Sequence, residues 1–243
     1  MTSAASGWPA DTDRVILEEV DSTSAEAARR APRAPAWILA HRQTGGHGRR
    51  GRPWATAPGN FAASLAWRPA GGPAEHALRS FVAALALHDA LDAMGVAGLS
   101  LKWPNDVLLD GGKVAGILLE SAGQGGQIDW LAIGIGVNLV SAPDLRDAAF
   151  PPVALGDGAP DADAFLDTLA GHYATEEDIL TRIGFEPIRE KWLRNAARLG
   201  EIITARTGTE ELTGRFETVD DQGRLVLVTP DGPRMIPAAD VFF

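Results

Sequence analysis

The spacing of apolar residues along the chain predicts three long helices. In residues 75–95, apolar side chains recur every three or four positions, as they do on the buried face of a helix. Two further helices are expected at 163–182 and 186–195, and Gly184 is expected to separate them. These segments can cover one face of a sheet.

The other periodic segments predict strands, with one short helix between the first two. Thr23 and Glu26 have the spacing of a capping box, so a helix is expected to begin there and to end near Arg30. The sequence Asp110–Gly112 is typical of a tight hairpin turn. Strands are expected at 14–20, 36–41, 60–67, 99–103, 106–109, 113–120 and 127–137.

The pattern changes near Ala197, where short strands punctuated by turns replace the helices. A segment of about fifty residues with this pattern has the size of a small β-barrel. We therefore expect two domains, residues 1–195 and residues 196–243, in this chain of 243 residues.

Composition and charge exclude several classes of protein. The net charge of −10 argues against nonspecific binding to nucleic acid, whose phosphates favour a basic partner. The absence of cysteine excludes disulfides, thiol nucleophiles and cysteine-ligated metals. The uncharged stretch from Trp130 to Pro143 is too short and too rich in glycine to cross a bilayer. The first residues do not resemble a secretory signal, so we expect a cytoplasmic protein without a membrane partner.

The segment from Arg42 to Trp54 is expected to be a loop that binds an anion. It contains four glycines and four arginines and no acidic residue. Glycines let consecutive backbone N–H groups turn towards an anion, and arginines offer forked donors to carboxylate or phosphate oxygens. A flexible, solvated basic loop is the alternative. The loop is not that of a P-loop NTPase, because the Gly-Lys-Ser/Thr ending is missing.

Two later segments also combine strands with unusual polar or small residues. Lys113 opens an otherwise apolar strand, in which a buried lysine needs an anionic partner. Gly116 in the same strand, and Gly134 and Gly136 in a later one, indicate close approach of a ligand or of another backbone. The alternatives are ordinary surface lysines, a turn capped by Asn105 or Asp106, and a strand that bends in order to pack.

Together these segments resemble the bacterial biotin–protein ligases. That family shows, in order, the motifs D-S-T-N, Q-x-x-G-R-G-R-x-G-R, K-W-P-N-D, G-K-x-x-G-I-L-x-E and G-x-G-x-N. The corresponding segments here are Asp21 to Ser24, Gln43 to Arg52, Lys102 to Asp106, Gly112 to Glu120 and Gly134 to Asn138. The resemblance implies an α+β fold: a mixed β-sheet with helices packed on it, of the class II synthetase-like biotin/lipoate ligase type, and a small C-terminal SH3-like β-barrel.

The resemblance also implies the reaction. Biotin and ATP, with Mg²⁺, give biotinyl-5′-AMP and pyrophosphate, and the biotinyl group then passes to a lysine of the biotin carboxyl carrier domain of a carboxylase. The expected catalytic residues are Lys113, which contacts the biotin carboxylate and the α-phosphate, Asp106, which orients and helps deprotonate the acceptor lysine, and Arg49, which closes the loop over the adenylate.

The same resemblance assigns residues that bind the substrates. No protein residue is assigned to Mg²⁺, which is expected to arrive with ATP. The expected binding residues are Ser22, Thr23, Ser24 and Gln43 for biotin, His47, Gly48, Arg49, Arg52 and Lys113 for the phosphate and the loop, Asn105 and Asn138 for the nucleotide, and Gly116, where the neighbouring strand residues wall the hydrocarbon tail. Trp37 is either part of that wall or plain core.

The chain departs from the family pattern at two positions. Ser24 replaces an asparagine and keeps a short polar group. His47 replaces the first arginine of the G-R-G-R motif. If that arginine contributes only backbone, nothing is lost; if its charge holds the phosphates, the enzyme is slower or pH-sensitive. The first family motif begins near residue 14, so we expect the monofunctional form without a DNA-binding domain, as a monomer or a homodimer.

Two other functions are compatible with parts of this pattern. A lipoate or octanoate ligase or transferase shares the broad fold, but has a different lysine motif. A ligand-sensing regulator would bind biotinyl-AMP and act through DNA or a partner, and the acidic charge speaks against it.

Overall fold

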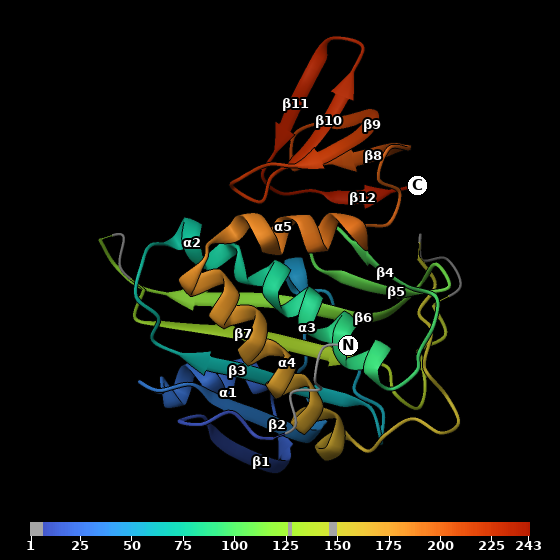
Figure 1. Cartoon of the computed structure of the whole chain (residues 1–243). Helices are drawn as coiled ribbons and strands as arrows, with labels where there is room; N and C mark the ends of the chain where they lie inside the picture. The colour runs from blue at the N-terminus through green and yellow to red at the C-terminus, as the bar shows by residue number, and fades with distance from the viewer. Residues whose placement is uncertain (1–6, 126–127, 146–149) are drawn as a thin grey trace.

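A mixed seven-stranded sheet has the strand order β1-β2-β3-β7-β6-β5-β4 (Figure 1). The computed structural model describes residues 7–125, 128–145 and 150–243. β1 and β2 are parallel and all other neighbours are antiparallel, which confirms the expected mixed sheet. The strands are β1 (Asp13–Val20), β2 (Ala36–Gln43), β3 (Phe61–Trp67), β4 (Leu99–Lys102), β5 (Asp106–Leu109), β6 (Gly112–Ala122) and β7 (Trp130–Val137).

The turn between β5 and β6 follows directly from its sequence. Asp110 and Gly111 have φ angles of 49° and 81°. Two successive positive φ angles suit a two-residue hairpin, and Asp-Gly is a favoured pair for it. The turn places Leu109 opposite Gly112, as expected. Residue 127, where the following strand was expected to begin, lies outside the described residues.

Five helices surround the sheet in the part of the chain that the structure describes. They are α1 (Thr23–Arg30), α2 (Pro73–Ala77), α3 (Arg79–Ala93), α4 (Ala162–Arg182) and α5 (Phe185–Arg194). The expected helix at 75–95 is therefore two helices, which meet at Leu78. The expected cap at Thr23 is also wrong, because the Ser22 hydroxyl accepts from Ala25 N instead. Glu26 pairs with arginines later in the same helix.

Alternating side chains of β2 face two different helices. Trp37 belongs to the main core and meets Tyr173 of α4 edge-to-face, with 5.9 Å between ring centroids. The next residue, Ile38, packs with Ala27 of α1 on the other face. This period of two is what a strand covered on both faces requires. Trp37 is 1% exposed and is core, not a pocket wall.

A second, smaller sheet forms the C-terminal part of the chain. Its order is β11-β10-β9-β8-β12, and every neighbouring pair is antiparallel. No β11–β12 pairing closes it among the described residues, so it is an open sheet of SH3-like type. Its strands are β8 (Ile202–Arg206), β9 (Glu211–Val219), β10 (Leu225–Thr229), β11 (Gly232–Ile236) and β12 (Asp240–Phe242).

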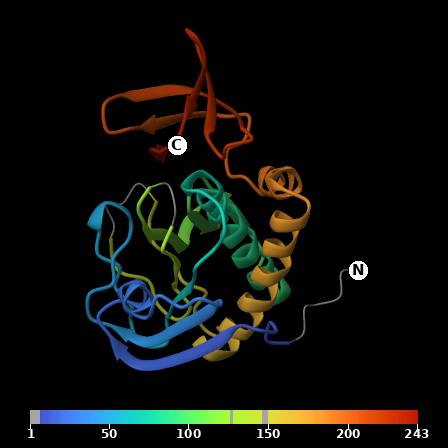
Figure 2. The same ribbon diagram turned by 90° about the vertical axis from the view of Figure 1, so that its left-hand side faces the viewer.

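The two sheets are joined at the edge strand β4. Leu101 N donates to Asn195 O and Ala197 N donates to Leu101 O, each at 2.8 Å. The Trp103 indole N–H also reaches Gly223 O at 3.0 Å. Figure 2 shows the C-terminal strands above the larger sheet and the helices α4 and α5 along one side. Within the described ranges, no helix has the length and apolar character needed to span a membrane.

Candidate functional site

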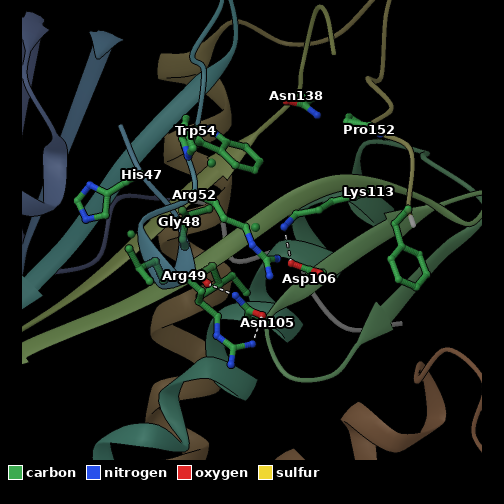
Figure 3. Close-up of a pocket in the computed structure, with 18 of the residues that line it drawn as sticks. His47, Gly48, Arg49, Arg52, Trp54, Asn105, Asp106, Lys113, Asn138 and Pro152 are labelled. Atoms are coloured by element: carbon green, nitrogen blue, oxygen red, sulfur yellow. Dashed lines mark hydrogen bonds and ion pairs between the residues drawn. The ribbon is translucent and has the colours of Figure 1, made fainter. Parts of the chain in front are cut away.

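A pocket of about 550 Å³ lies between the large sheet, the loop after β2 and the last strand of the small sheet. All the residues expected from the sequence to bind or react line this pocket (Figure 3). They are Ser22, Thr23, Ser24, Gln43, His47, Gly48, Arg49, Arg52, Asn105, Asp106, Lys113, Gly116 and Asn138. The sequence therefore predicted residues that lie together although up to 116 positions separate them.

One end of the pocket is neutral and rich in hydrogen-bonding groups. Thr23 N donates to Gln43 Oε1 at 2.8 Å, and Gln43 Nε2 donates to Thr56 Oγ1 at 3.1 Å. Ser64 Oγ donates to Thr23 Oγ1 at 2.9 Å and lies 3.2 Å from Ser24 Oγ. The capped start of α1 holds the serine and threonine residues in place. This network fixes donors and acceptors for a neutral polar ligand.

The middle of the pocket has a floor of glycine backbone. Gly116 of β6 and Gly136 of β7 are paired across the two strands. A Cβ at Gly136 would overlap the indole of Trp54, and one at Gly116 would lie 3.3 Å from Trp54 Cζ3. At Gly116 and Gly136 the close neighbour is thus a side chain, the indole of Trp54, and not the ligand or backbone that was expected; a Cβ at Gly134 would instead meet Ser24 Oγ at 2.8 Å.

The other end of the pocket contains two lysines and one carboxylate. Lys113 Nζ lies 2.6 Å from Asp106 Oδ1, and Lys102 Nζ lies 3.2 Å from Asp106 Oδ2. Burial alone would raise the pKa of Asp106, but the charges of Lys113 and Lys102 outweigh it and lower that pKa. Burial lowers the pKa of Lys102. Asp106 is thus held ionised between two cations.

The arginine-rich loop is anchored to the small sheet. Arg50 Nη1 and Arg52 Nη2 donate to Asp240 Oδ2 at 2.7 and 2.5 Å. Arg49 Nη1 donates to Ala239 O and to Asn105 Oδ1, each at 3.3 Å. Burial lowers the pKa of Arg49. The loop, predicted as irregular, contains one 3₁₀ turn at Arg49–Gly51.

His47 tethers the other side of the loop to β6. Its Nε2 lies 3.2 Å from Glu120 Oε1, and its Nδ1 lies 3.4 Å from Gly45 O. The hydrogen bond with Glu120 raises the pKa of His47. The other carboxylate oxygen, Glu120 Oε2, is buried and has no hydrogen-bond partner among the residues that the structure describes. His47 therefore contributes its side chain, and not only its backbone, to the loop.

The two asparagines expected at the nucleotide hold backbone carbonyls. Asn105 Nδ2 donates to Ile117 O at 2.6 Å, and Asn138 Nδ2 donates to Val153 O at 3.0 Å. Both residues line the pocket, and these bonds fix their orientation. Among the described residues, no group of three or more histidine and acidic side chains could hold a metal ion.

Three features of the pocket were missed from the sequence. Lys102 was considered only as part of a motif, Trp54 only as the end of the loop, and Asp240 not at all. In the sequence, the feature that could have identified Lys102 is its position in the same K-W-P-N-D segment as Asp106. Nothing local marks Asp240, because its arginine partners lie 188 and 190 positions away.

Comparisons with known proteins agree with this fold along the chain. Residues 18–138 match the model of the "Biotin/lipoate A/B protein ligase family", and residues 199–243 match that of the "Biotin protein ligase C terminal domain". A biotin--[acetyl-CoA-carboxylase] ligase from Paracoccus denitrificans is 54% identical, over 94% of this chain and 99% of that protein. The bifunctional ligase/repressor BirA of Bacillus subtilis is 30% identical, over 93% of this chain and 71% of that protein.

A solved structure shows the same fold. The biotin protein ligase from Aquifex aeolicus, in complex with biotin and ATP, superposes with a TM-score of 0.83. The alignment covers 94% of this chain and 98% of that one, at 24% identity. The two sheets and their helices are therefore a known arrangement.

Proposed function

Since the chain belongs to the biotin/lipoate A/B protein ligase family, we propose that its pocket joins biotin to ATP and then to the lysine of an acceptor protein. The chain is a biotin–protein ligase, and its acceptor is the carrier part of acetyl-CoA carboxylase. One observation supports this function most strongly: a single pocket has a neutral hydrogen-bonding end and a cationic end. Biotin has a neutral ureido ring at one end and a carboxylate at the other.

The neutral end binds the ureido ring. Ser22, Thr23 and Gln43 offer the hydroxyl and amide groups that a ring with N–H donors and a carbonyl acceptor needs. The hydrocarbon tail lies along the backbone of Gly116, beside Ile117. Its carboxylate then reaches Lys113 at the cationic end.

In the first step, a carboxylate oxygen of biotin attacks the α-phosphorus of ATP. The bond from that phosphorus to the bridging oxygen breaks, and pyrophosphate leaves with the electron pair. Lys113 and Arg49 reduce the repulsion between the two anions and stabilise the charge that develops on the phosphoryl oxygens. Arg52 binds phosphate after its ion pair with Asp240 has been replaced by one with the ligand.

In the second step, the acceptor lysine attacks the anhydride carbonyl carbon of biotinyl-5′-AMP. The ammonium first gives one proton to Asp106, and the amine nitrogen then bonds to the carbonyl carbon. The bond from that carbon to the AMP oxygen breaks with its electron pair on AMP, and the nitrogen gives its second proton to the leaving phosphate, which leaves the amide. An unperturbed lysine has a pKa of about 10.4, so a carboxylate at this position assists the attack. The loop around Arg49 excludes water, which would hydrolyse the anhydride.

Mg²⁺ enters this proposal as the counter-ion of ATP. When bound with ATP, the ion would offset the charge of the leaving pyrophosphate. The described residues offer no cluster of acids and histidines for it. We assign it no protein ligand.

The domain boundary and the setting of the protein are part of the same proposal. Residues 1–195 form the catalytic domain and residues 196–243 the SH3-like domain, whose last strand completes the pocket. The cytoplasmic location, the monomeric or homodimeric state and the lack of nucleic-acid binding remain predictions. Fractionation, sedimentation and a gel shift would test them.

Pyrophosphate release with Mg-ATP tests the function directly. Biotin, lipoate and octanoate are offered separately, and Lys113→Ala and Asp106→Ala are compared with the wild type. We expect release with biotin alone and a decrease of about 10²–10³-fold in Lys113→Ala. Asp106→Ala should lose mainly the transfer to the acceptor. Equal release with lipoate, or no release with any acid, would contradict the proposal.

A further inference from the structure

Asp106 lies between two lysines, one on each carboxylate oxygen. Lys113 Nζ contacts Oδ1 at 2.6 Å, and Lys102 Nζ contacts Oδ2 at 3.2 Å. Lys102 and Asp106 are paired across β4 and β5, and Lys113 comes from the start of β6. Figure 3 shows Lys113 pointing towards Asp106, with a dashed line that marks their ion pair. One buried carboxylate therefore has two cations where one would neutralise it.

The two lysines differ in how firmly they are held. The Lys113 side chain is 29% exposed, whereas that of Lys102 is only 7% exposed. Lys102 Nζ also lies 4.3 Å from the ring centroid of Phe150, which covers it. Phe150 itself meets Phe243 edge-to-face at 4.7 Å between centroids. Lys113 is thus free to reach towards a ligand, and Lys102 is not.

If Lys113 moved away and Asp106 had no second partner, the buried carboxylate would be left without a counter-ion. The Asp106 side chain is 12% exposed, and an unpaired buried carboxylate becomes protonated. A protonated Asp106 could not accept a proton from the acceptor lysine. Yet the proposed first step draws Lys113 towards the biotin carboxylate and the α-phosphate.

We infer that Lys102 is a positioning residue that stays with Asp106 as its counter-ion when Lys113 moves to the ligand. This inference rests on the proposed roles of Lys113 and Asp106. Oδ1 then opens to the acceptor lysine, while Oδ2 keeps its ion pair with Lys102. Among the described residues, the charged groups that act on this pair are Lys113, Arg49 and Asp240. Lys102 makes no contact with the substrates in this assignment.

The test is the pH dependence of the transfer step. Synthetic biotinyl-5′-AMP and a carboxyl carrier domain are supplied to the full chain, and single-turnover transfer is followed from about pH 5 to 9. In Lys102→Met, the pH below which the transfer rate falls (the acid limb of the profile) should rise by about one to three units. This is the usual effect of one nearby opposite charge on the pKa of a carboxyl group. Lys102→Arg should restore the wild-type limb.

Two comparisons separate this role from others. Lys102→Met should change the acid limb of transfer far more than the KM for ATP in pyrophosphate release, because Lys102 is assigned to Asp106 and not to phosphate. Lys191→Met is the matched control, since Lys191 also pairs with two carboxylates, Asp89 and Glu176, outside the pocket. The acid limb of the Lys191→Met profile should match that of the wild type when both are measured at a temperature at which the variant is folded.

The outcomes distinguish a failure of the role of Lys102 from a failure of the proposed ligase function. An unchanged acid limb in folded Lys102→Met, or a raised KM for ATP as the main effect, would overturn the role of Lys102. A wild-type protein that neither forms nor transfers the adenylate would overturn the proposed function instead. In ligand-free Lys102→Met, Lys113 still pairs with Asp106, so this variant should fold. If circular dichroism shows otherwise, Lys102→Gln carries the same comparison.

Discussion

Trp54 lies on the backbone of Gly136, so closely that any side chain at position 136 would overlap its indole. The contact joins the loop after β2 to the centre of the large sheet. Trp54 is half-buried, and Lys113 Nζ lies 5.6 Å from its ring centroid. The indole is therefore both a wall of the pocket and a neighbour of its cationic end.

Gly136→Ala should weaken biotin binding, because the new methyl group displaces Trp54 from its position on the backbone of residue 136. Overpacking of this kind costs about 1–3 kcal/mol, so the Kd for biotin should rise about 5- to 150-fold if that cost falls on the bound state. Isothermal titration calorimetry measures it. Gly208→Ala is the control, since a Cβ there meets no heavy atom within 4 Å. An unchanged Kd in Gly136→Ala would show that Trp54 does not shape the site.

The tether between His47 and Glu120 should make the loop pH-dependent. The Glu120 hydrogen bond raises the pKa of His47, so protonated His47 stabilises the closed loop. The stabilisation is complete below the unfolded-state pKa of about 6.5 and is lost as pH rises through the higher folded-state pKa. The pair is partly exposed, so its contribution is about 0.2–1 kcal/mol.

Limited trypsin cleavage after Arg49 and Arg50 reports on this tether. Wild type and His47→Gln are compared at each pH, so the pH dependence of the protease cancels. The wild type should be protected relative to the variant at low pH, and the two should converge at high pH. A constant ratio across the pH range would exclude the tether as a pH-sensitive element.

Asp240→Asn should loosen the same loop from the side of the small sheet. Although burial opposes the charged form of Asp240, its hydrogen bond to Arg52 and the charges of Arg52, Arg50 and Arg49 lower its pKa. Removing this charge should raise trypsin cleavage after Arg49 and Arg50 about fivefold, equivalent to about 1 kcal/mol. Asp231→Asn, in the same sheet, should leave cleavage unchanged. Equal cleavage in the two variants would mean that Asp240 does not hold the loop.

Phe165→Ala should destabilise the larger part of the molecule. Phe165 of α4 is fully buried and meets Phe61 of β3 edge-to-face, with 5.0 Å between ring centroids. Truncation of a core phenylalanine costs about 3–5 kcal/mol of unfolding free energy. Urea denaturation measures the change. Ile183→Ala, at a residue that is 73% exposed, should change that free energy by less than about 0.5 kcal/mol.

The sequence predicted those parts of the fold that are specified by neighbouring residues. The Asp110-Gly111 turn and the break at Gly184 are set by local backbone preference, and the structure confirms both. The cap of α1 was assigned one residue too late, because Ser22 and Thr23 are equally suitable and only the packed helix selects one. The break at Leu78 also has no strong local signal.

The candidate site was predicted from motifs, and the motifs omit its long-range contacts. Every assigned residue lines one pocket. The interactions that hold those residues were not predictable from spacing. Trp54 packs on glycines from two distant strands, and Arg52 pairs with Asp240 188 positions later. Such partners become visible only when the two sheets are placed together.

The pairing of the loop with β12 also determines when a newly made chain can first act. Arg50 emerges from the ribosome 190 residues before Asp240, its partner in the closed pocket. During that interval the loop lacks its anchor, and the wall formed by β12 does not exist. Synthesis must reach the last strand before the pocket is complete. A nascent chain that already holds the large sheet but not β12 therefore lacks the wall that would keep water from a reactive adenylate.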